Sequence, residues 1–360
     1  MSRIALCLAA GLAAVVATAS TAIAANYPVP KPGDWIAHNF KFRDGEVLSA
    51  VKLHYVTIGN PSGEPILILH GTFETSKSLL TPNFAGALFG PDQPFDARKY
   101  FIIIPDVLGS GGSTKPSDGL RIKFPRYDYT DVVNAEYQLV HDGLGIKHLR
   151  LVMGHSMGGM ETWIMGETYP SYMDALVPMA AEPAAIGGRN WMMRRVLIDA
   201  IEADPSWDGG YYKAEPQALH VDTLMFATAT NGGTLAYQAQ APSSAQGDAI
   251  LAKDLAMPFH IDADDEIYQV AAASDYNPTP GLDKISAQVL TIDSADDERN
   301  PTETGLMAEG LKHVRNAHFL LVPASAHTHG HNTMLYAHYY AHQLAAFLTS
   351  ALQRSTAPKT

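Results

Sequence analysis

A serine placed between two glycines, directly after an apolar run, constrains the fold of this chain more than any other feature. The segment "LRLVMGHSMGG" starts as a buried-strand pattern at 149–154 and continues into G-x-S-x-G, with Gly154, Ser156 and Gly158. A sharp strand-to-helix turn needs near-hydrogen side chains two positions to either side of the serine, because larger ones would collide across the turn. The pattern therefore predicts that Ser156 stands above a sheet, with the N-terminus of the next helix aimed at any anion formed there.

Strand-like and helix-like segments alternate on both sides of this turn. Strands are expected at 47–59, 65–71, 100–106, 149–154, 175–180, 287–294 and 318–325, and helices at 131–146, 157–170, 301–314 and 333–353. This order predicts an α/β fold with a mostly parallel central sheet flanked by helices. Between 182 and 284 the buried-strand runs stop and Trp, Met and Asp-Pro turns appear. We interpret 182–284 as an inserted helical cap, and 25–181 with 285–360 as the core.

The first 24 residues carry a targeting pattern. An arginine at position 3 precedes an apolar run from 4 to about 17, and Ala-Ile-Ala at 22–24 has the small-residue spacing of a cleavage site. We expect a signal peptide over 1–24 and a periplasmic or secreted product. The only cysteine, Cys7, lies inside this segment, so core packing alone would hold the mature chain together. No later stretch is apolar enough to span a membrane, and the net charge of −12 disfavours nucleic acid as a partner.

A nucleophilic serine needs an imidazole that takes its proton and a carboxylate that orients the imidazole. The strand, G-x-S-x-G and helix order resembles the α/β-hydrolase fold, in which the acid and then the histidine follow the serine in the chain. After the strand at 287–293, the loop "DSADDERNP" offers Asp293, Asp296, Asp297 and Glu298. Asp297 lies four residues before Pro301, a spacing common in α/β-hydrolases. Asp297 is therefore the first candidate for the acid and Asp296 the second.

Three histidines stand at alternate positions in "AHTHGHNTML" (326–335), namely His327, His329 and His331. Alternate residues of an extended chain face opposite sides, and no cysteine or H-x-x-x-H helix completes a zinc site, so we expect no metal and no other cofactor. The base should lie after the last strand and before the last helix. His327 follows the strand more closely and His331 directly precedes the helix, so the residues alone leave the two open.

Acyl-transfer chemistry also needs donors for the oxyanion of a tetrahedral intermediate. One is normally the backbone N–H after the nucleophile, here that of Met157, and another comes from the loop after an earlier buried strand. The strand 65–69 is followed by "HGTFETS". We expect the N–H of Thr72 to be the second donor, with Phe73 as the fallback.

Three segments resemble the homoserine O-acetyltransferase branch of the α/β-hydrolase superfamily. "GHSMGGMETW" is similar to its G-S-M-G-G-M-Q signature, "RRVLIDAIEADPSWDGGYY" (194–212) to its cap segment, and "HGHNTML" to its Gly-His-Asp loop. The resemblance implies the α/β-hydrolase fold and places the base at His331. Two departures keep the substrate from carrying over: Asn332 stands where those enzymes commonly have Asp, and His155 replaces a small residue. An exported enzyme would also not meet cytoplasmic acetyl-CoA.

The leading interpretation is an exported serine hydrolase that cleaves a carboxylic ester or related small acyl substrate through an acyl-enzyme on Ser156, with Asp297 and His331 completing a triad. One alternative passes the acyl group to an alcohol or amine instead of water. A second is a non-catalytic binding protein on a hydrolase scaffold. It is less favoured because serine, acid and histidine are all available in the expected order.

Overall fold

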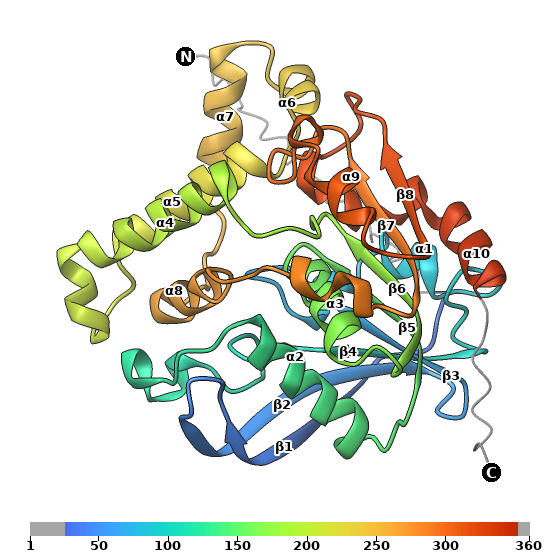
Figure 1. Ribbon diagram of the computed structural model, residues 1–360. Helices are drawn as coiled ribbons and strands as arrows, with labels where there is room; N and C mark the ends of the chain where they lie inside the picture. The colour runs from blue at the N-terminus through green and yellow to red at the C-terminus, as the bar shows by residue number, and fades with distance from the viewer. Residues whose placement is uncertain (1–25, 352–360) are drawn as a thin grey trace, which may run out of the picture.

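One eight-stranded sheet organises the computed structural model, which describes residues 26–351 (Figure 1). The strand order is β1-β2-β4-β3-β5-β6-β7-β8; β2 runs antiparallel to β1 and β4, and all other neighbours are parallel. The strands are β1 (Lys31–Lys41), β2 (Val47–Gly59), β3 (Glu64–Leu69), β4 (Tyr100–Pro105), β5 (Leu149–His155), β6 (Met173–Met179), β7 (Gln288–Ser294) and β8 (Ala317–Val322). The predicted mostly parallel sheet is confirmed. The expected signal peptide, 1–24, lies outside the described residues.

Helices cover both faces of the sheet. The helices of the described chain are α1 (Ala85–Leu88), α2 (Tyr129–Gln138), α3 (Met157–Thr168), α4 (Gly188–Ala203), α5 (Gln217–Thr230), α6 (Thr234–Gln240), α7 (Ser244–Leu255), α8 (Ala263–Ala271), α9 (Leu306–Leu311) and α10 (Ala341–Ser350). Side chains of a strand alternate between the two faces. In β3, Leu67 and Leu69 join a core with α2 and α3, whereas Ile66 and Ile68 join a core with α1 and α10. Burial on both faces explains the continuous apolar runs of the central strands.

Two elements differ from the expectation for physical reasons. Strand β1 was not predicted, because only Ala37 and Phe40 of its residues are buried; it joins the sheet by pairing along β2. The expected helix at 333–353 starts only at α10, because the preceding chain forms the short 3₁₀ helices Gly330–Leu335 and Ala337–Tyr339. The first of these 3₁₀ helices carries His331.

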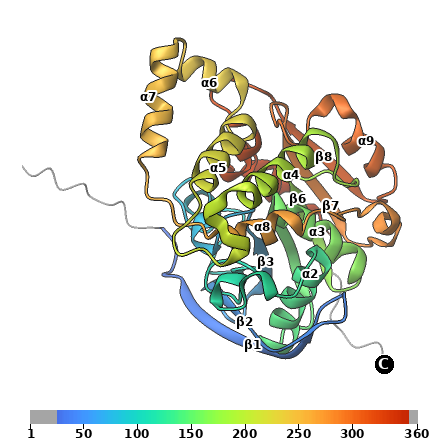
Figure 2. The ribbon, with the colours of Figure 1, turned by 90° about the vertical axis from the view of Figure 1, so that its left-hand side faces the viewer.

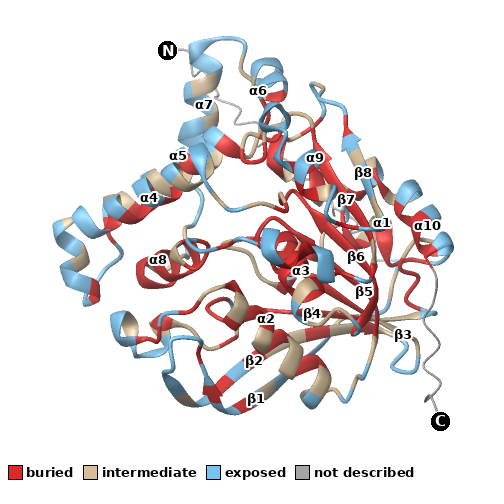
Figure 3. Ribbon diagram, in the orientation of Figure 1, coloured by how far each residue is buried: buried red, intermediate tan, exposed pale blue. Residues whose placement is uncertain are grey.

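The segment between β6 and β7 forms a group of helices, α4 to α8, beside the sheet (Figures 1 and 2). It has a hydrophobic cluster of its own, in which Leu197 and Ile201 of α4 meet Leu219 of α5 and Ile267 of α8. Helix α7 buries no residue and is largely pale blue in Figure 3, whereas the central strands β5 and β6 and helix α3 are mostly red. None of the helices within 26–351 has the length and apolar character needed to cross a membrane.

Candidate active site

Ser156 occupies a strained turn between β5 and α3. Its φ of 57° lies in the left-handed region, which residues with a side chain rarely adopt. A Cβ on Gly154 would fall 2.0 Å from the carbonyl oxygen of Gly158, and one on Gly158 would fall 2.5 Å from that of Leu69. Both glycines are therefore required by close backbone contacts. The turn is held by the Ser156 N–H, which donates to Met179 O on β6 at 2.9 Å.

Three side chains from distant parts of the chain meet at this turn. His331 Nε2 lies 2.7 Å from Ser156 Oγ, and His331 Nδ1 lies 2.8 Å from Asp297 Oδ2. All three residues are buried. Because the carboxyl ends of parallel strands share one edge of a sheet, the loops after β5, β7 and β8 bring these side chains together.

Asp297 is held by more than the histidine. Its Oδ1 accepts from the backbone N–H groups of Arg299 at 2.7 Å and Asn300 at 3.2 Å, and its Oδ2 accepts from the Asn300 side-chain amide at 2.9 Å. The Asn300 amide also donates to Ala180 O at 2.9 Å, which ties this loop to the end of β6. The carboxylate is thus fixed in one orientation before any substrate binds.

The electrostatics favour a neutral histidine beside an ionised carboxylate. Burial lowers the pKa of His331 to about 4, although Asp297 opposes this shift. Burial alone would raise the pKa of Asp297, but the His331 charge and the hydrogen bonds from His331 and Asn300 outweigh it, so this pKa lies below its usual range. Burial and the neighbouring Asp297 hold the pKa of Asp293 far above its usual range, so Asp293 is the protonated member of the carboxyl pair. At neutral pH, His331 can therefore accept the proton of Ser156.

The other candidates for acid and base lie elsewhere. Asp296 accepts from the Thr328 hydroxyl at 2.7 Å and from the Ser294 hydroxyl. His327 is exposed, and the ring of His329 stacks on Tyr336 with centroids 4.0 Å apart. Across residues 26–351, no group of three or more His, Cys, Asp or Glu side chains is arranged to hold a metal ion. The alternate histidines thus take three separate environments, and only His331 contacts Ser156.

The loop after β3 lies against the serine. Phe73 donates its backbone N–H to Gln269 Oε1 of α8 at 3.1 Å, so the fallback oxyanion donor is already occupied. Within the described chain, the N–H groups of Thr72 and Met157 have no hydrogen-bond acceptor. His70 fixes the loop, because its Nε2 accepts from the Val107 N–H at 3.2 Å while its Nδ1 lies 2.8 Å from Gly71 O. Of the expected oxyanion donors, Thr72 and Met157 thus keep an unoccupied N–H within residues 26–351.

A cavity of about 220 Å³ lies at Ser156. Helix α5 contributes Thr223, Phe226 and Ala227 to its wall. The core side contributes both departures from the acetyltransferase pattern, His155 and Asn332. Two further charged residues of the wall, Glu74 and Arg299, were not predicted. In the sequence, a single charged residue in a loop cannot be told from one that is exposed to solvent.

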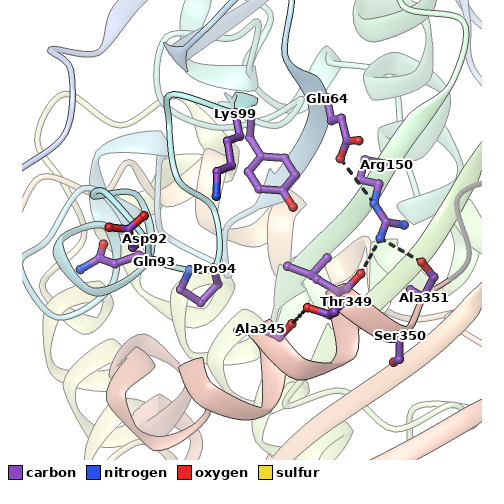
Figure 4. A pocket seen from close by; sticks show the side chains of 12 residues that line it. Glu64, Asp92, Gln93, Pro94, Lys99, Arg150, Ala345, Thr349, Ser350 and Ala351 are labelled. Atoms are coloured by element: carbon purple, nitrogen blue, oxygen red, sulfur yellow. Dashed lines mark hydrogen bonds and ion pairs between the residues drawn. The ribbon is translucent and has the colours of Figure 1, made fainter.

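A larger cavity, of about 780 Å³, lies away from the serine (Figure 4). Glu64 and Tyr100, where β3 and β4 begin, line it together with Arg150, which donates to the carbonyl oxygens of Leu348 at 2.7 Å and Ala351 at 3.1 Å. The amino ends of parallel strands lie at the edge opposite to the carboxyl ends. This cavity therefore sits across the sheet from Ser156 and adjoins the last described residue.

Comparison with known proteins supports the fold. The alpha/beta hydrolase fold family model matches residues 64–226. A homoserine O-acetyltransferase of Methanohalophilus mahii is 33% identical over 197 residues, which are 49% of this chain and 40% of that protein. The chain spans about half the length of the curated relatives it matches.

Solved structures share the fold. The crystal structure of a homoserine O-acetyltransferase from Bacillus anthracis has a TM-score of 0.76 at 22% identity and covers 91% of this chain and 100% of its own. An acetylester hydrolase from Corynebacterium glutamicum also has a TM-score of 0.76, at 20% identity, over 89% of this chain and 96% of its own. These two neighbours, one named a transferase and the other an ester hydrolase, thus share one fold.

Proposed function

Since the chain is an α/β-hydrolase similar to the homoserine O-acetyltransferases, we propose that it is a serine hydrolase that cleaves a small carboxylic ester through an acyl-enzyme on Ser156. The observation that carries this proposal is the pair of contacts of His331, 2.7 Å to Ser156 Oγ and 2.8 Å to Asp297 Oδ2, at the wall of a cavity.

The proposed reaction has two halves. His331 Nε2 takes the proton of Ser156 as Oγ attacks the ester carbonyl carbon, and the oxyanion is held by the N–H groups of Thr72 and Met157. The ester C–O bond then breaks, and the proton on His331 passes to the leaving alcohol. A water molecule, deprotonated by His331, then attacks the acyl carbon; the bond from that carbon to Ser156 Oγ breaks, His331 returns the proton to Oγ, and the carboxylic acid leaves. Asp297 keeps His331 in the required tautomer throughout.

Covalent labelling tests this proposal. A fluorophosphonate probe should label the folded wild type, and Ser156→Ala should lose both the label and the hydrolysis of a short-chain ester panel. Ser244→Ala, an exposed serine on α7, is the matched control and should keep both. A folded wild-type sample that neither takes the label nor cleaves any ester would refute the proposal.

Acyl transfer to an alcohol or amine is the second candidate, supported by the names of the relatives and by the cap residues over the cavity. The two candidates share the acyl-enzyme and differ only in the acceptor. Product analysis with an acyl donor, in the presence and absence of small alcohols and amines, separates them. Free acid as the main product at millimolar acceptor supports hydrolysis, and an acylated acceptor supports transfer.

Export is a further part of the proposal and rests on residues 1–24 alone. Expression of the full chain in a bacterium with a periplasm should give a product in the periplasmic or extracellular fraction. Its intact mass should correspond to a chain that begins at Ala25. A full-length product in the cytoplasm would contradict export without affecting the proposed chemistry.

A further inference from the structure

Arg299 is a buried cation at the wall of the Ser156 cavity. Its Nε donates to Thr230 Oγ1 at 3.1 Å and its Nη2 to Asn231 Oδ1 at 2.7 Å, and its guanidinium lies over the ring of Phe226, 4.4 Å from the centroid. These partners are all neutral. Within residues 26–351 Arg299 forms no ion pair, and its Nη1 has no hydrogen-bond partner.

The charges of Asp297 and Glu74 lie close enough to raise the pKa of Arg299, but neither carboxylate forms an ion pair with it. Asp297 is engaged by His331, and Glu74 accepts from the Gly71 N–H through Oε2 at 3.0 Å. A second buried arginine, Arg194, lies close enough to lower the pKa of Arg299. Burial and then Arg194 bring this pKa to about 9, so Arg299 stays charged at neutral pH.

Arg194 likewise has an unsatisfied donor and no paired anion among the described residues. Its Nε donates to Asn190 Oδ1 at 3.1 Å, its buried Nη2 has no partner, and it forms no ion pair with a described residue. Two cations are thus buried near each other without a paired anion. Such an arrangement is unfavourable unless an anion compensates it. A guanidinium is also the side chain best suited to bind a carboxylate, through its fixed fork of donors.

We propose that Arg299 is the anion-binding residue of the substrate cavity, and that the preferred substrate is an ester with a carboxylate on either its acyl or its alcohol part. This inference rests on the proposed ester chemistry at Ser156 and specifies its substrate class. Nε and Nη2 anchor the guanidinium to the end of α5, and Nη1 binds the substrate carboxylate. The charge of the nearby Arg194 strengthens the positive potential.

Measuring the binding of intact esters to the variant Ser156→Ala, which lacks the nucleophile, tests the inference directly. Calorimetry would compare two matched pairs of esters: ethyl hydrogen succinate with ethyl butyrate for an acyl carboxylate, and 3-acetoxypropanoate with propyl acetate for an alcohol carboxylate. In one pair the carboxylate ester should bind more tightly than its neutral match. Adding Arg299→Gln should reduce that preference by about 10- to 100-fold.

Two further variants separate a ligand contact from a structural role. Arg195→Gln, on an exposed part of α4, removes the same charge outside the cavity and should leave the preference unchanged. Arg299→Lys keeps the charge without the fork and should show a preference between those of wild type and Arg299→Gln. Thermal melts identify any variant that does not fold, and Arg299→Lys serves if Arg299→Gln fails.

The outcomes distinguish this inference from the proposed function. If the wild type cleaves esters but neither carboxylate ester binds better than its neutral match, or folded Arg299 variants keep the preference, Arg299 is structural and the inference is wrong. If a carboxylate ester binds through Arg299 but no ester is cleaved, the anion site stands and the hydrolase proposal fails.

Discussion

Replacing Asp297 by asparagine should nearly abolish turnover while leaving the fold intact. The new amide can place its NH₂ at either former oxygen position. At the Oδ1 position it would face the backbone N–H groups of Arg299 and Asn300, 2.7 and 3.2 Å away, which cannot change from donor to acceptor. At the Oδ2 position it would face the Asn300 amide and His331 Nδ1, 2.8 Å away. Only the imidazole can adapt, by moving its proton to Nε2.

That tautomer cannot accept the proton of Ser156, because Nε2 already carries one. By analogy with other serine triads, kcat should fall by about 10⁴-fold. The assay is steady-state hydrolysis of a short-chain ester, together with thermal melts of wild type and variant. Asp296→Asn is the matched control, since Asp296 contacts Thr328 and Ser294 rather than His331, and it should keep kcat within a few-fold. A folded Asp297→Asn with kcat within tenfold of wild type would refute the reasoning.

The remaining predictions test the base, the turn and the loop. Because the pKa of His331 is lowered to about 4, kcat/KM should stay flat through neutral pH and fall only as the pH drops through about 4; a fall near 6.5, the ordinary value for histidine, would contradict this. Gly154→Ala would put a Cβ 2.0 Å from a carbonyl oxygen, so activity should be lost and the free energy of unfolding should drop by about 3 kcal/mol in urea titrations. Gly247→Ala, in α7 with nothing within 4 Å of the added Cβ, should instead raise it by about 0.5–1 kcal/mol. Gln269→Ala removes the acceptor of the Phe73 N–H and should lower kcat about tenfold with little change in KM, as a displaced oxyanion loop requires; an equal rise in KM would indicate a binding role instead.

Most strands of the sheet were predictable because a strand that is buried on both faces has a continuous apolar run in its sequence. The central strands carry continuous apolar runs, and their predicted bounds agree with β3 to β7 within about three residues. Strand β1 has no continuous apolar run, since backbone pairing with β2 rather than side-chain burial holds it in place. The last helix begins at Ala341 because the 3₁₀ helix Gly330–Leu335, which carries His331, comes before it. The helical periodicity of the sequence does not reveal this 3₁₀ segment.

Some features of this protein follow from its sequence alone, because their physics lies within a few consecutive residues. The sterics of the turn at Ser156 require the glycine at 154, whose Cβ would meet the carbonyl oxygen of Gly158 four residues on, whereas the glycine at 158 is required by Leu69 of the neighbouring strand β3. Contacts between residues far apart in the chain were decided only by the tertiary structure. Sheet order and loop geometry determine that His331, rather than His327, reaches Ser156, and that Asp297, rather than Asp296, faces that ring. Folding likewise decides that the charged side chain of Arg299 is buried beside neutral hydrogen-bond partners and without an ion pair.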